Sequence, residues 1–206
     1  MSSANTVTAR VTGVHDDIVS IRMLRDAEGE FYPLTKNEVV LICPRRSDTG
    51  RSEKLQAEVL RVRHGEADVQ VFETTRGVAI GDAVEQTGQM LSVALGPGLL
   101  GQVYDGLQNP LELIAGQHGY FLPRGLAVDG IDQQQKWSFQ PVVKVGTRVK
   151  AGDLLGRVPE GKFSHKIMVP FNLRGEAEVS WVQEGTFNVA TPVVRVRLQN
   201  GEEREI

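Results

Sequence analysis

The chain has 206 residues, a formal net charge of −3 and only 6% aromatic residues. This length allows one large or two modest domains, and the low aromatic content predicts cores built of aliphatic side chains. Basic residues are scattered, apart from Arg45, Arg46 and Arg51 in a stretch rich in Ser, Asp and Thr. We interpret that stretch as a solvated loop, and we do not expect nucleic acid as a partner.

Cysteine usage and hydropathy narrow the class further. Cys43 is the only cysteine, so neither an intrachain disulfide nor a Cys-based zinc site can form. Its apolar neighbours at 39–42 and Pro44 predict a buried strand thiol. The N-terminus lacks the pattern of a secretory signal, and no apolar run approaches the ~20 residues of a membrane span. We expect a soluble, cytoplasmic chain with no direct membrane insertion.

Alternating apolar and polar residues begin at the N-terminus. Val7, Ala9 and Val11 share one face of a predicted strand, and 18–23 alternates in the same way after a short turn, which predicts a hairpin. Further strands are predicted at 38–43, 55–64 and 67–72. Short strands with no helical period between them predict a small closed β-barrel over residues 1–76.

The sequence pattern changes in the segment 77–111. A turn is predicted around Gly81 and Asp82, whose residue types suit positive φ and hydrogen bonding to turn N–H groups. Gly96-Pro97-Gly98 ends any regular element, and the sequence after it predicts one short helix at 99–107, closed by Asn109-Pro110. This is the one helix that we expect.

A second β-rich region follows at about 112–186. The pattern Val-x-x-Gly-Asp-x-Leu at 149–155 echoes the turn at 78–84, and a looser echo lies at 182–196. Paired hairpins of this kind suggest a sandwich with quasi-twofold symmetry, although chance similarity between Val-rich hairpins is the alternative. The predicted fold class is mainly β, with an N-terminal barrel and a second, sandwich-like domain.

One stretch comes close to a phosphate-binding P-loop. Gly156, Gly161 and Lys162 have the spacing of that motif, but Phe163 stands where a Ser or Thr must ligate Mg²⁺. Pro159 removes an N–H group from the phosphate cradle, and the following residues predict a strand where a P-loop opens a helix. We therefore interpret the stretch as a hairpin loop and assign no cofactor-binding residue.

Other combinations of chemically active residues are equally incomplete. The four histidines are far apart in sequence and lack the spacing of metal ligands. Ser164 and His165 are adjacent in a predicted strand, so their side chains point to opposite faces, and no Gly-x-Ser-x-Gly motif supports a nucleophile. We assign no catalytic and no metal-binding residue. The histidines are His15, His64, His118 and His165.

Lys166 raises a separate possibility, because lipoyl and biotinyl carrier domains are flattened β-sandwiches with a modified lysine at a hairpin tip. The run 149–155 followed by Lys166 and Pro170 has some of that character. Carriers flank the lysine with Met or with Asp and Ala, whereas here the neighbours are His165 and Ile167. The carrier fold is therefore a better match than the carrier function.

Three stretches together carry a family resemblance. They are residues 71–84 (VFETTRGVAIGDAV), residues 91–111 (LSVALGPGLLGQVYDGLQNPL) and residues 165–175, beginning HKIMVP. They resemble the catalytic A subunit (alpha chain) of V-type and archaeal rotary ATPases, and the resemblance spans essentially the whole chain.

The resemblance implies a role for each part. Residues 1–76 would be the N-terminal barrel that joins barrels of neighbouring A and B subunits into a ring. Residues 77–111 would lead into the nucleotide-binding domain, and 112–186 would be the outward bulge, or non-homologous insertion, that meets the peripheral stalk. Residues 187–206 would return to the catalytic core. Within the insertion, we expect an exposed contact loop that includes Asp129, Asp132, Gln133 and Lys136.

The family's P-loop, catalytic Glu and adenine-contacting residues correspond to positions beyond residue 206. The resemblance thus implies a longer parent that binds ATP or ADP with Mg and couples ATP synthesis or hydrolysis to proton or sodium transport, whereas this chain alone is expected to be inactive. Without the core, apolar side chains would be exposed, so we expect self-association or disorder at 96–101. These side chains are Leu91, Val93, Leu95, Leu99 and Leu100.

We weigh three hypotheses. The leading one is a structural and interaction module of a rotary ATPase. The second is a carrier domain modified at Lys166, which an intact-mass measurement would reveal. The third is a stand-alone barrel adaptor.

Overall fold

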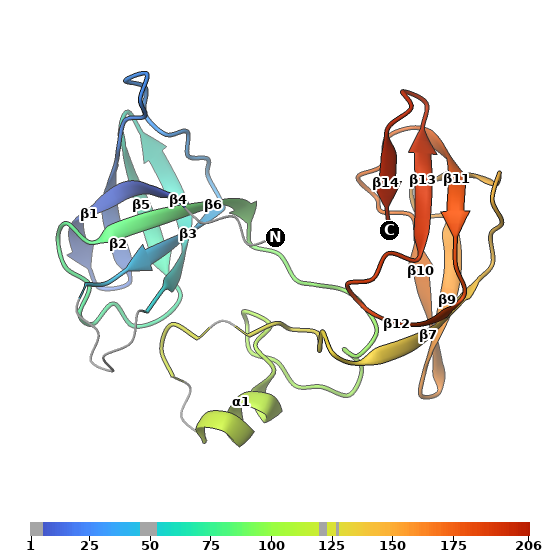
Figure 1. Cartoon of the computed structure of the whole chain (residues 1–206). Coiled ribbons are helices and arrows are strands. Elements are labelled where there is room, and N and C mark those ends of the chain that lie inside the picture. The colour runs from blue at the N-terminus through green and yellow to red at the C-terminus, as the bar shows by residue number, and fades with distance from the viewer. Residues whose placement is uncertain (1–5, 46–52, 120–122, 127) are drawn as a thin grey trace. The chain divides into compact units, whose positions relative to one another are not determined.

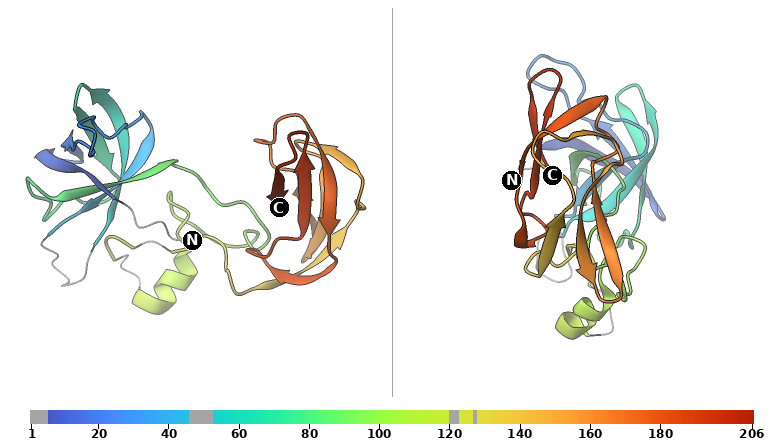
Figure 2. Two further views of the ribbon diagram at one scale, coloured as in Figure 1. Left: turned by 45° about the horizontal axis from the view of Figure 1, so that its top comes forward. Right: turned by 90° about the vertical axis from the view of Figure 1, so that its right-hand side faces the viewer.

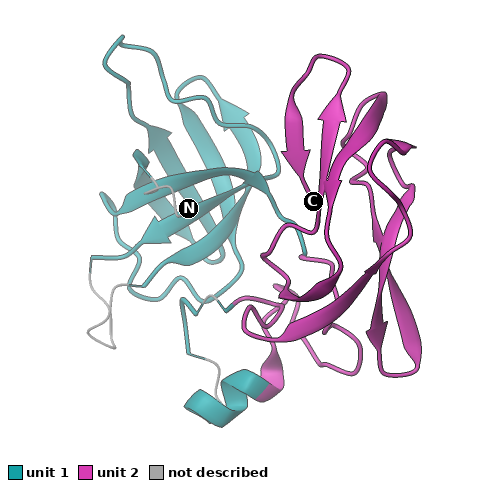
Figure 3. Ribbon diagram, turned by 45° about the vertical axis from the view of Figure 1, so that its right-hand side comes forward, with its two compact units in different colours: residues 1–93, 113–128 teal, residues 94–112, 129–206 magenta. Residues whose placement is uncertain are grey.

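The computed structural model describes residues 6–45, 53–119, 123–126 and 128–206. The chain divides into two compact units (Figure 3). One unit contains residues 1–93 and 113–128, and the other contains 94–112 and 129–206. Each unit is therefore assembled from two separate stretches of sequence.

The first unit is built on a closed six-stranded barrel (Figure 1), which confirms the predicted barrel. The strands are antiparallel neighbours in the order β1-β2-β5-β4-β3-β6, and β6 pairs with β1 to close the barrel. They are β1 (Val7–His15), β2 (Ile18–Met23), β3 (Glu38–Cys43), β4 (Leu55–Arg63), β5 (Glu66–Val71) and β6 (Ala83–Met90).

The barrel interior is aliphatic, as the composition predicts. Val19, Ile21, Ile42 and Leu55 are completely buried, and each comes from a position that points inward in its strand. Burial of such a side chain stabilises the fold by about 1.5–3 kcal/mol. Many small apolar side chains thus hold the barrel together. Phe31, which is partly buried, packs against them.

The barrel extends past the boundary expected at residue 76. The strand β6 pairs with both β1 and β3, and its Val84 is completely buried in the barrel core. The segment 77–111 therefore supplies the closing strand before it leaves the barrel. The reason lies in the turn at 78–82, where the buried Asp82 accepts a hydrogen bond from the Ala79 N–H group and directs the chain back into the sheet.

The helix expected at 99–107 is wrong. Gly98 and Gly101 have φ angles of +102° and +83°, which a right-handed helix cannot contain. The described residues instead contain one helix, α1 (Leu111–His118), which begins directly after Pro110. Its Glu112 lies in the first turn and His118 in the last, a charge order that suits the helix dipole.

The second unit contains two four-stranded sheets, in agreement with the predicted sandwich. Their orders are β10-β9-β7-β12 and β14-β13-β11-β8 (Figures 1 and 2). Leu155, Val179 and Val196 are completely buried in the shared core, beside Phe139. The strands are β7 (Lys136–Pro141), β8 (Arg148–Lys150), β9 (Leu154–Glu160), β10 (Phe163–Met168), β11 (Glu176–Val182), β12 (Gly185–Asn188), β13 (Val194–Leu198) and β14 (Glu203–Glu205).

The borders of this unit also differ from those expected. Residues 187–206, expected as a return segment, supply β13 and β14, because Val194 and Val196 are buried in the sandwich core. Residues 113–128, expected within the insertion, group with the barrel. The sandwich therefore runs from Asp129 to Ile206 and is completed by residues 94–112.

Two smaller expectations concern single residues. Cys43 is half-buried in β3, and burial together with the negative charge of Glu85 raises the pKa of its thiol to about 11, as suits an unreactive strand thiol. Arg45 is exposed, whereas Arg46 and Arg51 lie outside the described residues. Among those described, no helix is long and apolar enough to cross a membrane.

Candidate functional site

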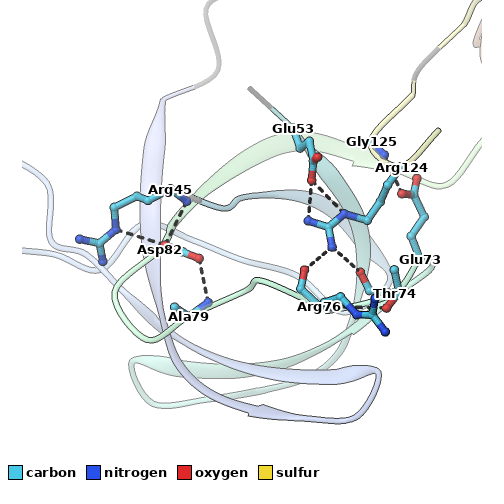
Figure 4. A network of polar contacts seen from close by, with 9 residues as sticks. All are labelled: Arg45, Glu53, Glu73, Thr74, Arg76, Ala79, Asp82, Arg124 and Gly125. Carbon is cyan, nitrogen blue, oxygen red and sulfur yellow. Dashed lines mark hydrogen bonds and ion pairs between the residues drawn. The ribbon is translucent and has the colours of Figure 1, made fainter. Parts of the chain in front are cut away.

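A buried ion pair connects the barrel to the segment that returns to it. Arg124 donates to Oε2 of Glu53 from Nε at 2.9 Å and from a terminal nitrogen at 2.5 Å (Figure 4). Both side chains are largely buried, with 15% and 5% of their surface exposed. The Arg124 guanidinium also donates to the backbone carbonyls of Thr74 and Arg76. One side chain thereby joins three stretches of the first unit.

Two further carboxylates strengthen the same end of the barrel. Glu73 accepts a hydrogen bond from the backbone N–H of Gly125 at 2.7 Å, next to the Arg124 contact (Figure 4). Asp82 is 1% exposed and accepts from both the backbone and the side chain of Arg45. These contacts fix backbone positions, and the arrangement offers no free acid, base or nucleophile at this end among the groups shown in Figure 4.

The second unit uses a different kind of anchor. Glu160, at the end of β9, is 7% exposed, and its Oε1 accepts hydrogen bonds from the backbone N–H groups of Gly98 at 2.6 Å and Leu100 at 3.4 Å. Its second oxygen lies 3.3 Å from Nδ1 of His165. Burial and then the charge of Glu160 raise the pKa of Tyr104. A carboxylate thus secures the glycine-rich segment 96–101 to the sandwich.

The stretch that approaches a P-loop forms the β9–β10 hairpin. Gly156 lies inside β9, and a Cβ atom there would fall 2.3 Å from the ring of Phe139 and 2.7 Å from a backbone oxygen of β7, so this glycine serves packing. Gly161 and Lys162 form the hairpin turn, and Phe163 begins β10. With no helix N-terminus behind the turn and no hydroxyl at Phe163, these residues do not fit a Mg–nucleotide phosphate.

The remaining candidate groups are not brought together. Lys166 lies inside β10, opposite Arg157 of β9, and the hairpin tip is formed by Gly161 and Lys162, so the carrier hypothesis gains no support. Ser164 and His165 point to opposite faces of that strand. Within the part of the chain that the structure describes, no cluster of three His, Cys, Asp or Glu residues could hold a metal ion.

The expected contact loop lies on the surface of the second unit. Asp129, Asp132 and Lys136 are exposed, and Gln133 is half-buried with its amide donating to the carbonyl of Ile131. The Asp132 carboxylate accepts from the Gln134 N–H at 2.8 Å, which orders a turn ahead of β7. The loop is therefore accessible to a partner, and its role as a contact site stays a prediction.

The apolar residues expected to be exposed are so, with one exception. Leu91, Val93, Leu95 and Leu100 have 46%, 58%, 82% and 55% of their surface exposed, whereas Leu99 is half-buried. Monomeric proteins seldom leave such a run uncovered. Self-association and disorder at 96–101 stay predictions, although Gly98 and Leu100 are anchored by Glu160.

Sequence reasoning missed both anchoring carboxylates. Glu53 and Arg124 are 71 residues apart, and Glu160 lies 62 residues from Gly98, so no local spacing connects the partners. The sequence did contain one signal for Glu160. It is the single acidic residue on an otherwise apolar face of β9, and a buried carboxylate must have a partner.

Family models match both units. The model described as "ATP synthase alpha/beta family, beta-barrel domain" matches residues 38–88, and the "ATPsynthase alpha/beta subunit barrel-sandwich domain" matches residues 128–206. The chain belongs to the ATP synthase alpha/beta family. The first match covers most of β3–β6, four of the six barrel strands, and the second covers all the strands of the sandwich, in agreement with the observed fold.

Relatives within the family share a single description. The chain is 54% identical over 154 residues, or 74% of its length, to "V-type ATP synthase alpha chain 1" of Treponema pallidum. It is 45% identical over 93% of its length to the V-type ATP synthase alpha chain of Treponema denticola, and 47% identical over 93% to that of Borrelia turicatae. It spans only 26%, 31% and 31% of these relatives, respectively, so it corresponds to one segment of them.

Proposed function

We propose that the chain acts as a non-catalytic assembly segment of a V-type ATP synthase alpha chain. The observation that carries the proposal is the identity of 45% over 93% of this chain but only 31% of a relative so named. The segment thus matched contains two β domains and, among its described residues, no phosphate-binding loop. In the full-length protein, ATP or ADP and Mg would bind elsewhere, and ATP synthesis or hydrolysis would be coupled to proton or sodium transport.

The barrel would contact the barrels of neighbouring B subunits in a ring. Closure leaves the barrel no free strand edge, so such contacts must use its outer side chains. One outer region is suited to this, because a groove of about 700 Å³ is lined by Leu41, Lys54, Thr87, Met90 and Leu91, among others. Met90 and Leu91 are 62% and 46% exposed there, which makes them the expected apolar contacts.

The sandwich would be the outward insertion that meets the peripheral stalk. Its contact loop, with Asp129, Asp132, Gln133 and Lys136, presents both signs of charge to solvent. A polar surface of this kind is typical of contacts between subunits that can separate, whereas a permanent interface is usually more apolar. In this role the chain would be cytoplasmic and peripheral to the membrane, as part of the ATPase head.

Co-purification with the B subunit of the same enzyme tests the barrel assignment. The variant Met90→Glu with Leu91→Glu should lose the B subunit, because two desolvated apolar contacts become charged. Leu60→Glu with Val62→Glu is the matched control, since these β4 residues are exposed but do not line the groove. If both double variants retained the B subunit equally well, the groove would not be the contact site for that subunit.

A calorimetric titration with Mg–ATP tests the non-catalytic assignment. The chain should show no binding at micromolar nucleotide, because Phe163 and Pro159 leave the β9–β10 hairpin without a phosphate cradle. A saturable, stoichiometric heat would contradict this part of the proposal.

A further inference from the structure

The two sheets of the sandwich differ in how the charged residues on their outer faces are paired across strands. In the sheet β14-β13-β11-β8, directly paired residues form the row Arg148, Glu178, Arg197 and Glu203, in which the sign alternates from strand to strand. The ion pair between Arg197 and Glu203 closes at 2.9 Å. Opposite charges across neighbouring strands are stabilising. This sheet therefore neutralises its own outer face.

The other sheet leaves its cations unmatched. Gln140 of β7 pairs with Arg157 of β9, and Arg157 pairs with Lys166 of β10, so two cations lie directly opposite each other. Both are exposed, and no ion pair or hydrogen bond involves either side chain among the residues described. Like charges directly opposite are destabilising. This row of paired residues, from Gln140 to Lys166, therefore contains two cations and no anion.

The strand that carries Lys166 is also a sheet edge. Among the strands that the structure describes, β10 is the terminal one of its sheet and pairs with β9 alone. In an antiparallel pair, hydrogen-bonded and non-hydrogen-bonded residues alternate. Ser164 is opposite Pro159, which has no N–H to donate, so Ser164 and, two residues on, Lys166 occupy non-hydrogen-bonded positions. Their backbone N–H and C=O groups therefore point away from β9.

Apolar surface accompanies this open edge. Phe163 and Met168, the first and last residues of β10, are 67% and 39% exposed. An uncovered edge of six residues with apolar ends is a template for another strand, which natural proteins usually protect. The cation Lys166 at its centre gives protection against a second copy of the same edge, since the two lysines would repel each other.

We propose that β10 binds an extended acidic segment of a partner polypeptide, which adds to the sheet as a further strand. Its backbone would pair with the outward groups of Ser164 and Lys166, and its carboxylates would complete the charge row beyond Lys166 and Arg157. A polypeptide suits the edge better than a nucleic acid or an anionic membrane does, because only a polypeptide backbone satisfies both the N–H and the C=O groups. The inference concerns a surface distinct from the groove and contact loop above and does not depend on them.

The probe is a synthetic peptide of alternating Glu and Val, titrated into the ¹⁵N-labelled 206-residue chain and followed by NMR. Amide shifts should concentrate in β10 and β9. The double variant Arg157→Glu with Lys166→Glu should weaken binding by about tenfold or more, as expected for loss of close opposite charges. Lys144→Glu with Arg174→Glu is the matched control, with the same change in net charge at exposed positions outside this sheet, and should bind as the parent does.

A second variant separates strand addition from simple charge attraction. Ser164→Pro removes an outward N–H without changing charge, at an edge position where proline is tolerated. It should weaken the Glu–Val peptide several-fold while the spectrum of the remaining chain is retained. Peptide binding unaffected by Ser164→Pro, equal losses in the two charge variants, or binding of poly-U RNA or phosphatidylserine vesicles in place of the peptide would each overturn the proposal.

Discussion

Each unit contains a buried carboxylate that holds a distant stretch of the chain, but the two carboxylates have different partners. In the barrel unit, Glu53 pairs with the guanidinium of Arg124, a full charge from 71 residues away. In the sandwich unit, Glu160 accepts from the backbone N–H groups of Gly98 and Leu100. Loss of the Arg124 guanidinium removes a full positive charge from beside a buried anion, whereas loss of the Glu160 carboxylate removes an acceptor from neutral backbone amides. The barrel anchor should therefore be the more costly one to break.

The largest effect is expected for Arg124→Met, which removes the cation and keeps an apolar side chain of similar length. The buried Glu53 would lose this cation, and breaking a buried pair from one side costs about 3–5 kcal/mol of unfolding free energy. Denaturant unfolding of the parent and the variant measures this loss.

Two comparisons establish whether the cost arises from the buried charge of Glu53. Adding Glu53→Gln to Arg124→Met should restore part of the stability, because the buried side chain then carries no charge. Arg22→Met breaks an ion pair with Glu66 that is mostly exposed, and should cost only about 0.2–1 kcal/mol. If Arg22→Met proved as damaging as Arg124→Met, burial would not be what distinguishes the barrel anchor.

The sandwich anchor is tested by Glu160→Gln, which keeps the shape of the side chain but removes its charge. Hydrogen bonds to a charged acceptor are worth about 1.5–3 kcal/mol, and the amide retains part of this. Hydrogen exchange at Gly98 and Leu100 should therefore accelerate. Glu184→Gln, at an exposed site in the same unit, serves as the control and should leave both amides unchanged.

A packing change in the same strand gives a comparable or smaller loss. Gly156→Ala places a Cβ atom against the ring of Phe139 and a backbone oxygen, and such overpacking costs about 1–3 kcal/mol. Gly106→Ala is the control, because no atom lies within 4 Å of the added Cβ. Thermal unfolding distinguishes them, and equal melting temperatures would contradict the packing role of Gly156.

The smallest effect concerns an acid on the barrel surface. A hydrogen bond from the Ser20 hydroxyl, at 3.0 Å, is the main cause that holds the pKa of Asp68 below its ordinary 3.8, with help from Arg61. A lowered folded pKa contributes stability above pH 3.8 that is lost as the pH falls through the folded value. Ser20→Ala should thus cost about 0.5–1.5 kcal/mol at neutral pH and progressively less as the pH falls below 3.8. A cost that is constant with pH would contradict this.

The sequence predicted the barrel well because alternation in β1–β5 is a local property that survives in the folded chain. Prediction from the sequence failed where contacts between residues far apart in the chain decide the local structure. The apolar run after Gly98 has helical composition, but positive φ at Gly98 and Gly101 and the Glu160 contact hold it in turns that cannot form a helix. The like-charged pair Arg157 and Lys166 is invisible in sequence, since eight residues lie between them and only strand register makes them neighbours.

The central claim is that the barrel and the sandwich serve different assembly contacts of a V-type ATP synthase alpha chain. Cross-linking mass spectrometry on the intact enzyme, with a lysine-reactive reagent, tests it directly. Lys36 and Lys54 of the barrel unit should cross-link to B subunits, and Lys136, Lys162 and Lys166 of the sandwich unit to the peripheral stalk. Cross-links from the sandwich lysines to B-subunit barrels, or from the barrel lysines to the stalk alone, would contradict the account.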